Sequence, residues 1–233
     1  KQQSSNKRNL VMRPLNLSLS EKSLENYVTS QICLFYPDDN IIEQKAISHC
    51  VQQSLKRLRI CFDAIRLKYY ADNRASYFNH LHGDHYSSFL YLMSNFLYKE
   101  GYETLASKFF LLNKAMFGID AYYGITLPDH FMFIHPLGTV LGNGVYNDFL
   151  VVYQSVTVGA TTDGIYPTFS GNNILYSNTS VIGDCKVGKN VTFAAESMVI
   201  NQNINDSVTV LGKFPSNRFK ENTKGLIEKY FIV

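Results

Sequence analysis

The sequence predicts an α+β chain, in which an N-terminal all-α helical domain precedes a left-handed parallel β-helix, a solenoid with a six-residue repeat. Three observations support this prediction. Apolar residues recur at helical spacing up to about residue 117, the composition changes at Gly118, and apolar residues recur at every sixth position from about Leu127. A period of six fits neither an α-helix nor a plain strand, and it is typical of coils built from short strands and turns.

The first helices are expected after a polar tail of residues 1–17. Ser18 and Glu21 have the spacing of a capping box and predict the start of a helix. The helical domain is expected over residues 18–118, and the turn-forming run 36–40 ends its first helix.

A long amphipathic helix follows, because apolar residues recur there at intervals of three and four. Its expected buried residues are Ile47, Cys50, Val51, Leu55, Leu58, Cys61, Phe62 and Ile65. Two further helices are expected over residues 86–98 and 102–117, separated near Gly101.

The β-helix is expected over residues 119–212, followed by a C-terminal extension over residues 213–233. One apolar residue in each six-residue step (hexad) should point inward and stack on its equivalent one coil away. In the most regular stretch these residues are Leu175, Val181, Val187, Phe193 and Val199. Three hexads make a coil of about 18 residues, so about five coils are expected. The register slips near residues 145–150, and residues 161–166 are expected to loop outward.

The composition argues against several function classes. The net charge of +3 comes with no basic face carrying interleaved aromatic residues, so no nucleic-acid partner is expected. No apolar run reaches the ~18 residues of a membrane span. The four cysteines, Cys33, Cys50, Cys61 and Cys185, have no metal-ligand spacing, and a reduced, cytoplasmic chain is therefore expected.

Several motifs between residues 88 and 219 resemble those of serine acetyltransferases, which belong to the hexapeptide-repeat (left-handed β-helix) acyltransferase superfamily. The motifs are Phe96-Leu-Tyr-Lys-Glu-Gly-Tyr-Glu-Thr-Leu-Ala, Phe117-Gly-Ile-Asp120, His135-Pro-Leu-Gly-Thr-Val-Leu-Gly, Gln154-Ser-Val-Thr-Val-Gly and Gly212-Lys-Phe-Pro215. The interval from Asp120 to His135, together with the run from Gln154, is the more specific part of the resemblance.

The resemblance implies an O-acetyltransferase with acetyl-CoA as co-substrate. An alcohol needs a base to attack a thioester at neutral pH, and the resemblance assigns that role to His135, with Asp120 as its orienting partner. It also implies a coenzyme groove between neighbouring copies of a homotrimer, with a dimer of trimers as the alternative. The coenzyme-binding residues it implies are Gly159, Thr161, Ser177, Ala195 and Pro215.

The acceptor side departs from the family pattern. Ile134 stands where the family has an aspartate, and Ile165-Tyr166 stand where it has an arginine and a histidine. Isoleucine cannot pair with the charges of serine, so we expect a sugar or a polysaccharide precursor as acceptor, near Ile134, Tyr166 and His85. Two alternatives stay open: a serine O-acetyltransferase of cysteine biosynthesis, and a non-enzymatic β-helix scaffold.

A competing interpretation comes from His80-Leu-His82-Gly-Asp84-His85, which has the HxHxDH pattern of two-zinc metallo-β-lactamase-fold hydrolases. That fold needs strands before the motif, whereas residues 44–70 are predicted to be helical. No metal is therefore expected, and the histidines are expected beside the acceptor pocket or on a solvent-facing loop.

Overall fold

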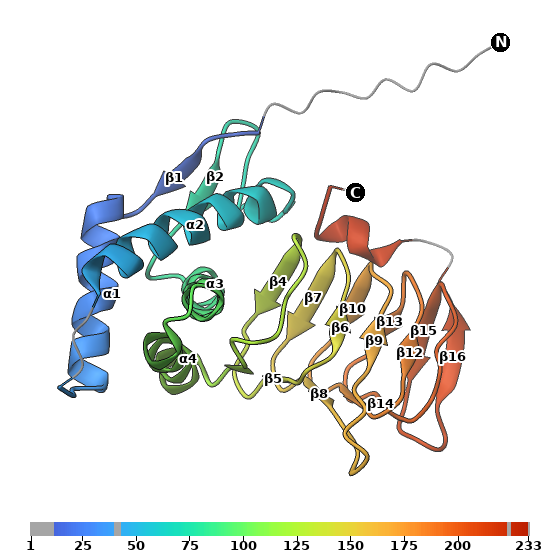
Figure 1. The fold of residues 1–233 in the computed structure, drawn as a ribbon. Coiled ribbons are helices and arrows are strands. Elements are labelled where there is room, and N and C mark those ends of the chain that lie inside the picture. The colour runs from blue at the N-terminus through green and yellow to red at the C-terminus, as the bar shows by residue number, and fades with distance from the viewer. Residues whose placement is uncertain (1–11, 40–42, 223–224, 233) are drawn as a thin grey trace.

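The computed structural model describes residues 12–39, 43–222 and 225–232, and it shows a helical half followed by a parallel β-solenoid of about five coils (Figure 1). The α+β prediction is therefore confirmed. The described helices are α1 (Glu21–Phe35), α2 (Gln44–Asp63), α3 (Gly83–Lys99) and α4 (Glu103–Phe117). Within the described ranges, none of them is both long enough and apolar enough to cross a bilayer.

The beginning of the helical half differs from the prediction. Ser20, rather than Ser18, caps α1 by accepting a hydrogen bond from the backbone N–H of Ser23 at 3.1 Å. Strand β1 (Leu15–Leu17), predicted to lie in a polar tail, pairs in parallel with β2 (Ser76–Phe78). The rest of the predicted tail, residues 1–11, lies outside the described residues. This pairing could not be predicted, because a three-residue strand is too short to show alternation of apolar and polar residues.

The solenoid has three walls, each a stack of parallel strands. Wall 1 consists of β4 (Phe131–Ile134), β7 (Leu150–Tyr153), β10 (Asn173–Leu175), β13 (Thr192–Phe193) and β15 (Val208–Leu211). Wall 2 consists of β3 (Asp120–Ala121), β5 (Val140–Leu141), β8 (Thr157–Gly159), β11 (Ser180–Ile182) and β14 (Met198–Ile200). Wall 3 consists of β6 (Val145–Tyr146), β9 (Thr168–Phe169) and β12 (Lys186–Val187).

The hexad residues fill the interior of the solenoid as the repeat predicts. Val181 pairs with Val199 on the next coil and with Val158 on the previous one, and each of these three side chains is fully buried. The other predicted hexad residues, Leu175, Val187 and Phe193, are at most 1% exposed. Leu141 and Tyr146, both buried, are five residues apart, so the slip in register falls at this turn.

One turn is much longer than its equivalents. Residues 160–167 connect β8 to β9, whereas residues 183–185 make the corresponding connection from β11 to β12. Figure 1 shows this longer connection projecting away from the walls, as predicted for residues 161–166.

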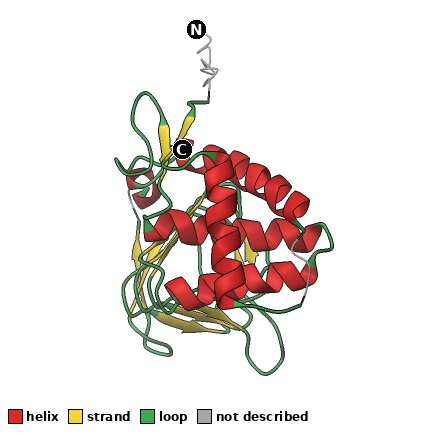
Figure 2. Ribbon diagram, turned by 90° about the vertical axis from the view of Figure 1, so that its left-hand side faces the viewer, coloured by secondary structure: helices red, strands yellow, loops and turns green. Residues whose placement is uncertain are grey.

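Each end of the solenoid is covered by other parts of the chain. The helices lie over the first coil (Figure 2), where the hydroxyl of Tyr91 donates to the carbonyl of Ile125 at 2.9 Å and accepts from the N–H of Leu127 at 3.0 Å. At the other end β16 (Arg218–Glu221) pairs antiparallel with β15. These contacts satisfy backbone groups that an open solenoid end leaves unpaired.

The last described residues return along wall 1 to the helical half. After the 3₁₀ helix η1 (Leu226–Lys229), the hydroxyl of Tyr230 is hydrogen-bonded to those of Tyr153 at 2.8 Å and Tyr176 at 3.1 Å. Phe231 is fully buried, and the N–H of Ile232 donates to the carbonyl of Ala64, just after α2, at 2.7 Å.

We predict that Val181→Ala destabilises the protein by about 2 kcal/mol, because it removes two buried methyl groups and leaves a cavity between coils. The matched control is Val145→Ala on wall 3, where the side chain is 55% exposed. Its effect should stay within about 0.5 kcal/mol. Urea unfolding of both variants measures the difference, and equal effects would contradict the inward orientation of the hexads.

Candidate active site

His135 lies at the corner between walls 1 and 2, directly after β4. The local sequence explains its position: β4 is buried along its whole length, and the turn then uses Pro136 and Gly138. The backbone of His135 is left-handed, with φ of 50°, and its carbonyl accepts a hydrogen bond from the N–H of Leu137 at 2.7 Å. The residue is exposed, so its imidazole is accessible at this corner.

A pocket of about 440 Å³ lies where this corner meets the helical half. The beginning of α3, the end of α4 and the turn after His135 line it. Its polar side chains are His82, Asp84 and His135, and apolar groups from Leu81, Met116, Phe117 and Leu137 make up much of the rest.

Asp84 approaches His135 most closely among the polar side chains of this pocket. One oxygen of its carboxylate, Oδ1, accepts a hydrogen bond from the backbone N–H of His135 at 3.0 Å. Asp84 is 8% exposed, and burial raises the pKa of its carboxyl although the hydrogen bond and the charges of His82 and His135 act in the opposite direction. The sequence analysis did not assign Asp84 to this site, because a contact between residues 51 positions apart leaves no local pattern.

Asp120, the predicted partner of His135, lies on the preceding coil. Its backbone N–H donates to the carbonyl of Thr139 at 2.8 Å, so the two corners are adjacent. Its carboxylate forms an ion pair with Lys114 at 2.6 Å. Across the residues that the structure describes, no hydrogen bond joins Asp120 to the ring of His135, and the orienting role stays a prediction.

Two of the predicted coenzyme-binding residues, Ser177 and Ala195, follow His135 along the same edge of the prism, and Pro215 lies beyond its far end, over wall 2. The N–H of Ser155 donates to the carbonyl of Leu137 at 2.9 Å, and the N–H of Glu196 donates to that of Ser177 at 2.9 Å, so successive corners stack. Ala195 is exposed on this edge, and Pro215 follows just beyond the last corner, where the N–H of Phe214 bonds the carbonyl of Met198 at 2.9 Å. Backbone hydrogen bonds between successive corners therefore form a continuous column along this edge.

Gly159, Thr161 and Tyr166 lie on a different edge, between walls 2 and 3. A side chain at Gly183 would come within 2.8 Å of Thr161, and one at Gly142 would overlap the ring of Tyr166, so both loop residues pack against neighbouring corners. The structure therefore divides the predicted site residues between two edges of one chain.

Two predicted acceptor residues are buried. Ile134 is 8% exposed at the end of β4, and His85 is fully buried among Phe62, Tyr70 and Phe78. Burial lowers the pKa of His85 to about 3, which keeps its ring neutral at physiological pH.

The side chains of the HxHxDH motif do not converge on one point, although the rings of His82 and His85 stack with their centroids 4.1 Å apart. His80 bonds the hydroxyl of Ser18 at 2.7 Å, His85 lies in the core, and His82 and Asp84 face the pocket. The described part of the chain contains no group of three or more metal-ligating side chains arranged to hold an ion.

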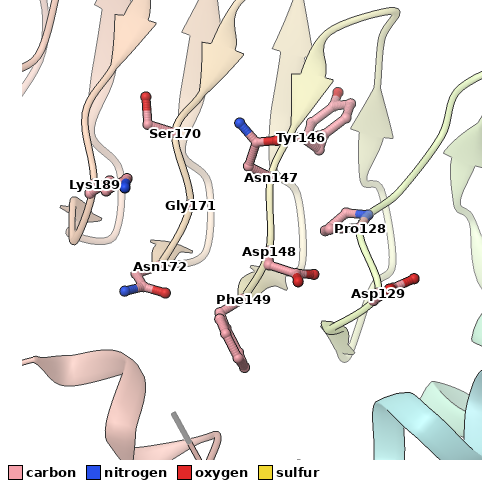
Figure 3. A pocket seen from close by; sticks show the side chains of 10 residues that line it. All are labelled: Pro128, Asp129, Tyr146, Asn147, Asp148, Phe149, Ser170, Gly171, Asn172 and Lys189. Atoms are coloured by element: carbon pink, nitrogen blue, oxygen red, sulfur yellow. The ribbon is translucent and has the colours of Figure 1, made fainter.

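A second groove, of about 520 Å³, lies on the third edge, between walls 3 and 1 (Figure 3). Its charged side chains are Asp129, Asp148 and Lys189. Asp129 is paired with Arg57 at 3.1 Å, and Asp148 accepts from the N–H of His130 at 3.0 Å. None of the predicted site residues lines this groove, so the pocket at His135 is the candidate active site.

Comparison with known proteins gives a consistent result. The chain is 25% identical over 124 residues to a serine acetyltransferase of Synechococcus elongatus, covering 52% of this chain and 50% of that protein. It is 26% identical over 126 residues to one of Staphylococcus epidermidis, covering 52% and 59%. The matches thus span between half and three fifths of the length of these curated relatives. No protein-family model matches the chain.

Solved structures extend the similarity to most of the fold. A serine acetyltransferase from Brucella abortus, in complex with coenzyme A, superposes with a TM-score of 0.68 at 18% identity, covering 89% of this chain and 84% of that one. The Neisseria gonorrhoeae serine acetyltransferase gives a TM-score of 0.67 at 21% identity, covering 88% and 81%.

The three-walled solenoid beside a helical half is thus a fold that this chain shares with solved serine acetyltransferases. In sequence the chain is similar to curated serine acetyltransferases over about half of their length, in line with the resemblance of its motifs.

We predict that Gly142→Ala displaces Tyr166 and loosens residues 160–167. The added Cβ would meet the ring of Tyr166 and would lie 2.7 Å from the carbonyl oxygen of Val158, which cannot move away. We expect a loss of about 2 kcal/mol and faster proteolysis within the loop. Gly164→Ala, in the same loop with nothing within 4 Å, is the control, and its φ of 71° should cost about 1 kcal/mol without exposing Tyr166. Equal cleavage rates in the two variants would contradict this packing.

Proposed function

We propose that this protein is an acetyl-CoA-dependent O-acetyltransferase in which His135 is the general base. The observation that carries the proposal is the exposed imidazole at a solenoid corner, in a pocket walled by the helical half, in a chain whose relatives are serine acetyltransferases. The structure of one solved neighbour is a complex with coenzyme A, and the corner column next to His135 is the path that we propose for the coenzyme here.

The chemistry follows from the pocket. A neutral imidazole takes the proton from the hydroxyl of the acceptor as the oxygen attacks the thioester carbon, and it returns a proton to the leaving thiolate. The developing oxyanion also needs hydrogen-bond donors. The N–H groups of the corner at His135 already donate within the chain, so the donor has to come from another part of the assembled site. Apolar groups of Met116, Phe117 and Leu137 line the same pocket, and a bound coenzyme and acceptor would displace water from them.

The coenzyme is proposed to lie along the edge that carries Ser177 and Ala195, toward Pro215, with its sulfur at His135. Gly159 and Thr161 project from the edge at the other side of wall 2. Residues on two different edges can border one groove if the prisms of two copies stand side by side. In a homotrimer each site would take one edge from each of two neighbouring copies, so this arrangement supports the trimer.

The identity of the acceptor is less constrained than the role of His135. Relatives and structural neighbours named serine acetyltransferase favour L-serine over the sugar acceptor expected from the sequence. A sugar stays the second candidate because Ile165, 49% exposed, and Tyr166 offer no charge where they replace the family's arginine and histidine. Ile134 cannot supply the carboxylate that the family has at its position, but Asp84 places a carboxylate in the pocket.

The proposal predicts that the wild-type protein releases coenzyme A thiol from acetyl-CoA when L-serine is added. His135→Asn should lower kcat by about 10²–10⁴-fold without weakening coenzyme binding, because it removes only the base. A thiol-release assay with L-serine and a panel of free and nucleotide-linked sugars measures this. Turnover of sugars alone would reverse the acceptor assignment, and coenzyme binding without turnover of any acceptor would favour the scaffold.

Asp120→Asn tests the proposed orienting role. If Asp120 holds the ring of His135 in the assembled protein, this variant should lower kcat by at least about tenfold. Lys114→Ala is the matched control, because it removes the ion-pair partner and leaves the carboxylate in place. Variants that both retain wild-type kcat would show that Asp120 serves only an exposed ion pair, which contributes at most about 1 kcal/mol to stability.

A further inference from the structure

The HxHxDH motif contains a carboxylate that the proposed reaction does not yet use. Asp84 lies in the first turn of α3, and its Oδ1 accepts the N–H of His135 at 3.0 Å. Its other oxygen, Oδ2, receives no hydrogen bond from any residue in the described ranges, and Asp84 lines the same pocket as the imidazole of His135. The side chain thus has one oxygen bonded to the backbone of the proposed base and a second oxygen without a hydrogen bond, in a pocket that both residues line.

The ionised carboxylate of Asp84 lowers the stability of the fold. Burial raises the pKa of Asp84, and a carboxyl with a raised pKa stabilises the fold only in its protonated form. That contribution is present at low pH and is lost as the pH rises through the raised pKa, so the ionised group weakens the fold at neutral pH. An unfavourable buried charge beside a proposed catalytic group is typical of functional sites.

We propose that Asp84 is a second positioning residue for His135, beside the role proposed for Asp120. It fixes the left-handed backbone that directs the imidazole into the pocket, and its negative charge stabilises the imidazolium that forms when the base takes a proton. The catalytic half of this inference rests on the proposed function, whereas the structural half does not.

The backbone role has a clear physical basis. His135 is a non-glycine residue with φ of 50°, a conformation that side chains disfavour and that persists only where surrounding contacts hold it. The N–H of His135 points to Asp84 and not to a neighbouring strand. A carboxylate acceptor makes a stronger hydrogen bond to an N–H than a neutral acceptor does.

The proposed effect of the negative charge of Asp84 follows from the titratable groups near it. The titratable groups that affect it are His82 and His135, and both favour its ionised form. Asp120 is paired with Lys114, so its charge is already balanced. Asp84 is therefore the carboxylate that lines this pocket together with His82 and His135.

The first experiment measures hydrogen exchange at the amide of His135 in the wild-type protein, in Asp84→Asn and in Asp84→Ala. Asparagine keeps an oxygen acceptor and alanine removes it. Exchange should be at least about tenfold faster in Asp84→Ala than in the wild type, with Asp84→Asn close to the wild type. Unchanged protection in Asp84→Ala would overturn the proposal whether or not the protein has transferase activity.

The second experiment measures kcat and KM in the thiol-release assay. Asp84→Asn should lower kcat by about 10- to 100-fold and leave the KM for acetyl-CoA within about twofold, because it removes charge and keeps the backbone hydrogen bond. Asp84→Glu should recover part of the loss. A kcat equal to that of the wild type in Asp84→Asn would overturn the charge role while leaving the proposed function intact.

Thermal unfolding separates these effects from general damage. Asp84→Asn should be as stable as the wild type at neutral pH, or more stable, because it removes a poorly solvated charge. Glu25→Gln is the matched control: Glu25 is 5% exposed and, against the effect of burial, hydrogen bonds from Lys22 and Ser48 hold its pKa below the usual value. That variant should lose stability and keep wild-type kcat. An activity loss in Asp84→Asn that merely follows a fall in stability would overturn the proposal.

Discussion

The contact between α3 and the first coil is the constraint on which the rest of the structure depends. A parallel solenoid satisfies its backbone by stacking coils, so its first coil has unpaired groups on one side. Here Tyr91 and Asn95 of α3 form hydrogen bonds with the backbone of that coil. The hydroxyl of Tyr91 donates to the carbonyl of Ile125 and accepts from the N–H of Leu127. The amide of Asn95 donates to the carbonyls of Tyr123 at 2.7 Å and Ile125 at 2.9 Å. These side chains are buried, so their loss would leave carbonyls and an N–H without partners in an apolar setting.

The same helix determines where the pocket forms. Its C-terminal part covers the coil, and its first turn therefore lies at the corner where β4 ends, next to His135. The aromatic ring of Tyr91 packs edge-on against Phe131 and Phe133 of β4, which fixes the strand relative to the helix. A shift in this packing would change the distance between Asp84 and His135, because both residues lie directly next to the packed segments. The stability of the junction and the geometry of the site are thus coupled.

The repeat made most of the architecture predictable. A side chain that recurs every six residues can be inward at every step only in a three-walled coil, and the burial of Val181 and Val199 follows from that periodicity alone. The corner at His135 was also predictable, through its motif. The position of Asp84 was not, because it depends on how two halves of the chain dock. The capping role of Ser20 was missed for a simpler reason, since Ser18 and Ser20 are both good caps and only tertiary contacts choose between them.

Tyr230, Phe231 and Ile232 join the far end of the chain to the residues that follow α2. Stacked-coil proteins ordinarily fray from their termini, one repeat at a time. Here Phe231 and Ile232, which follow the last coil, pair with Ile65 and Ala64 across wall 1, so the segment after the outermost coil is held against the helical half. Unwinding by single coils must first break this pairing. Its late position in the chain also means that a nascent polypeptide can complete the pairing only when synthesis has passed Ile232, when all five coils are already available.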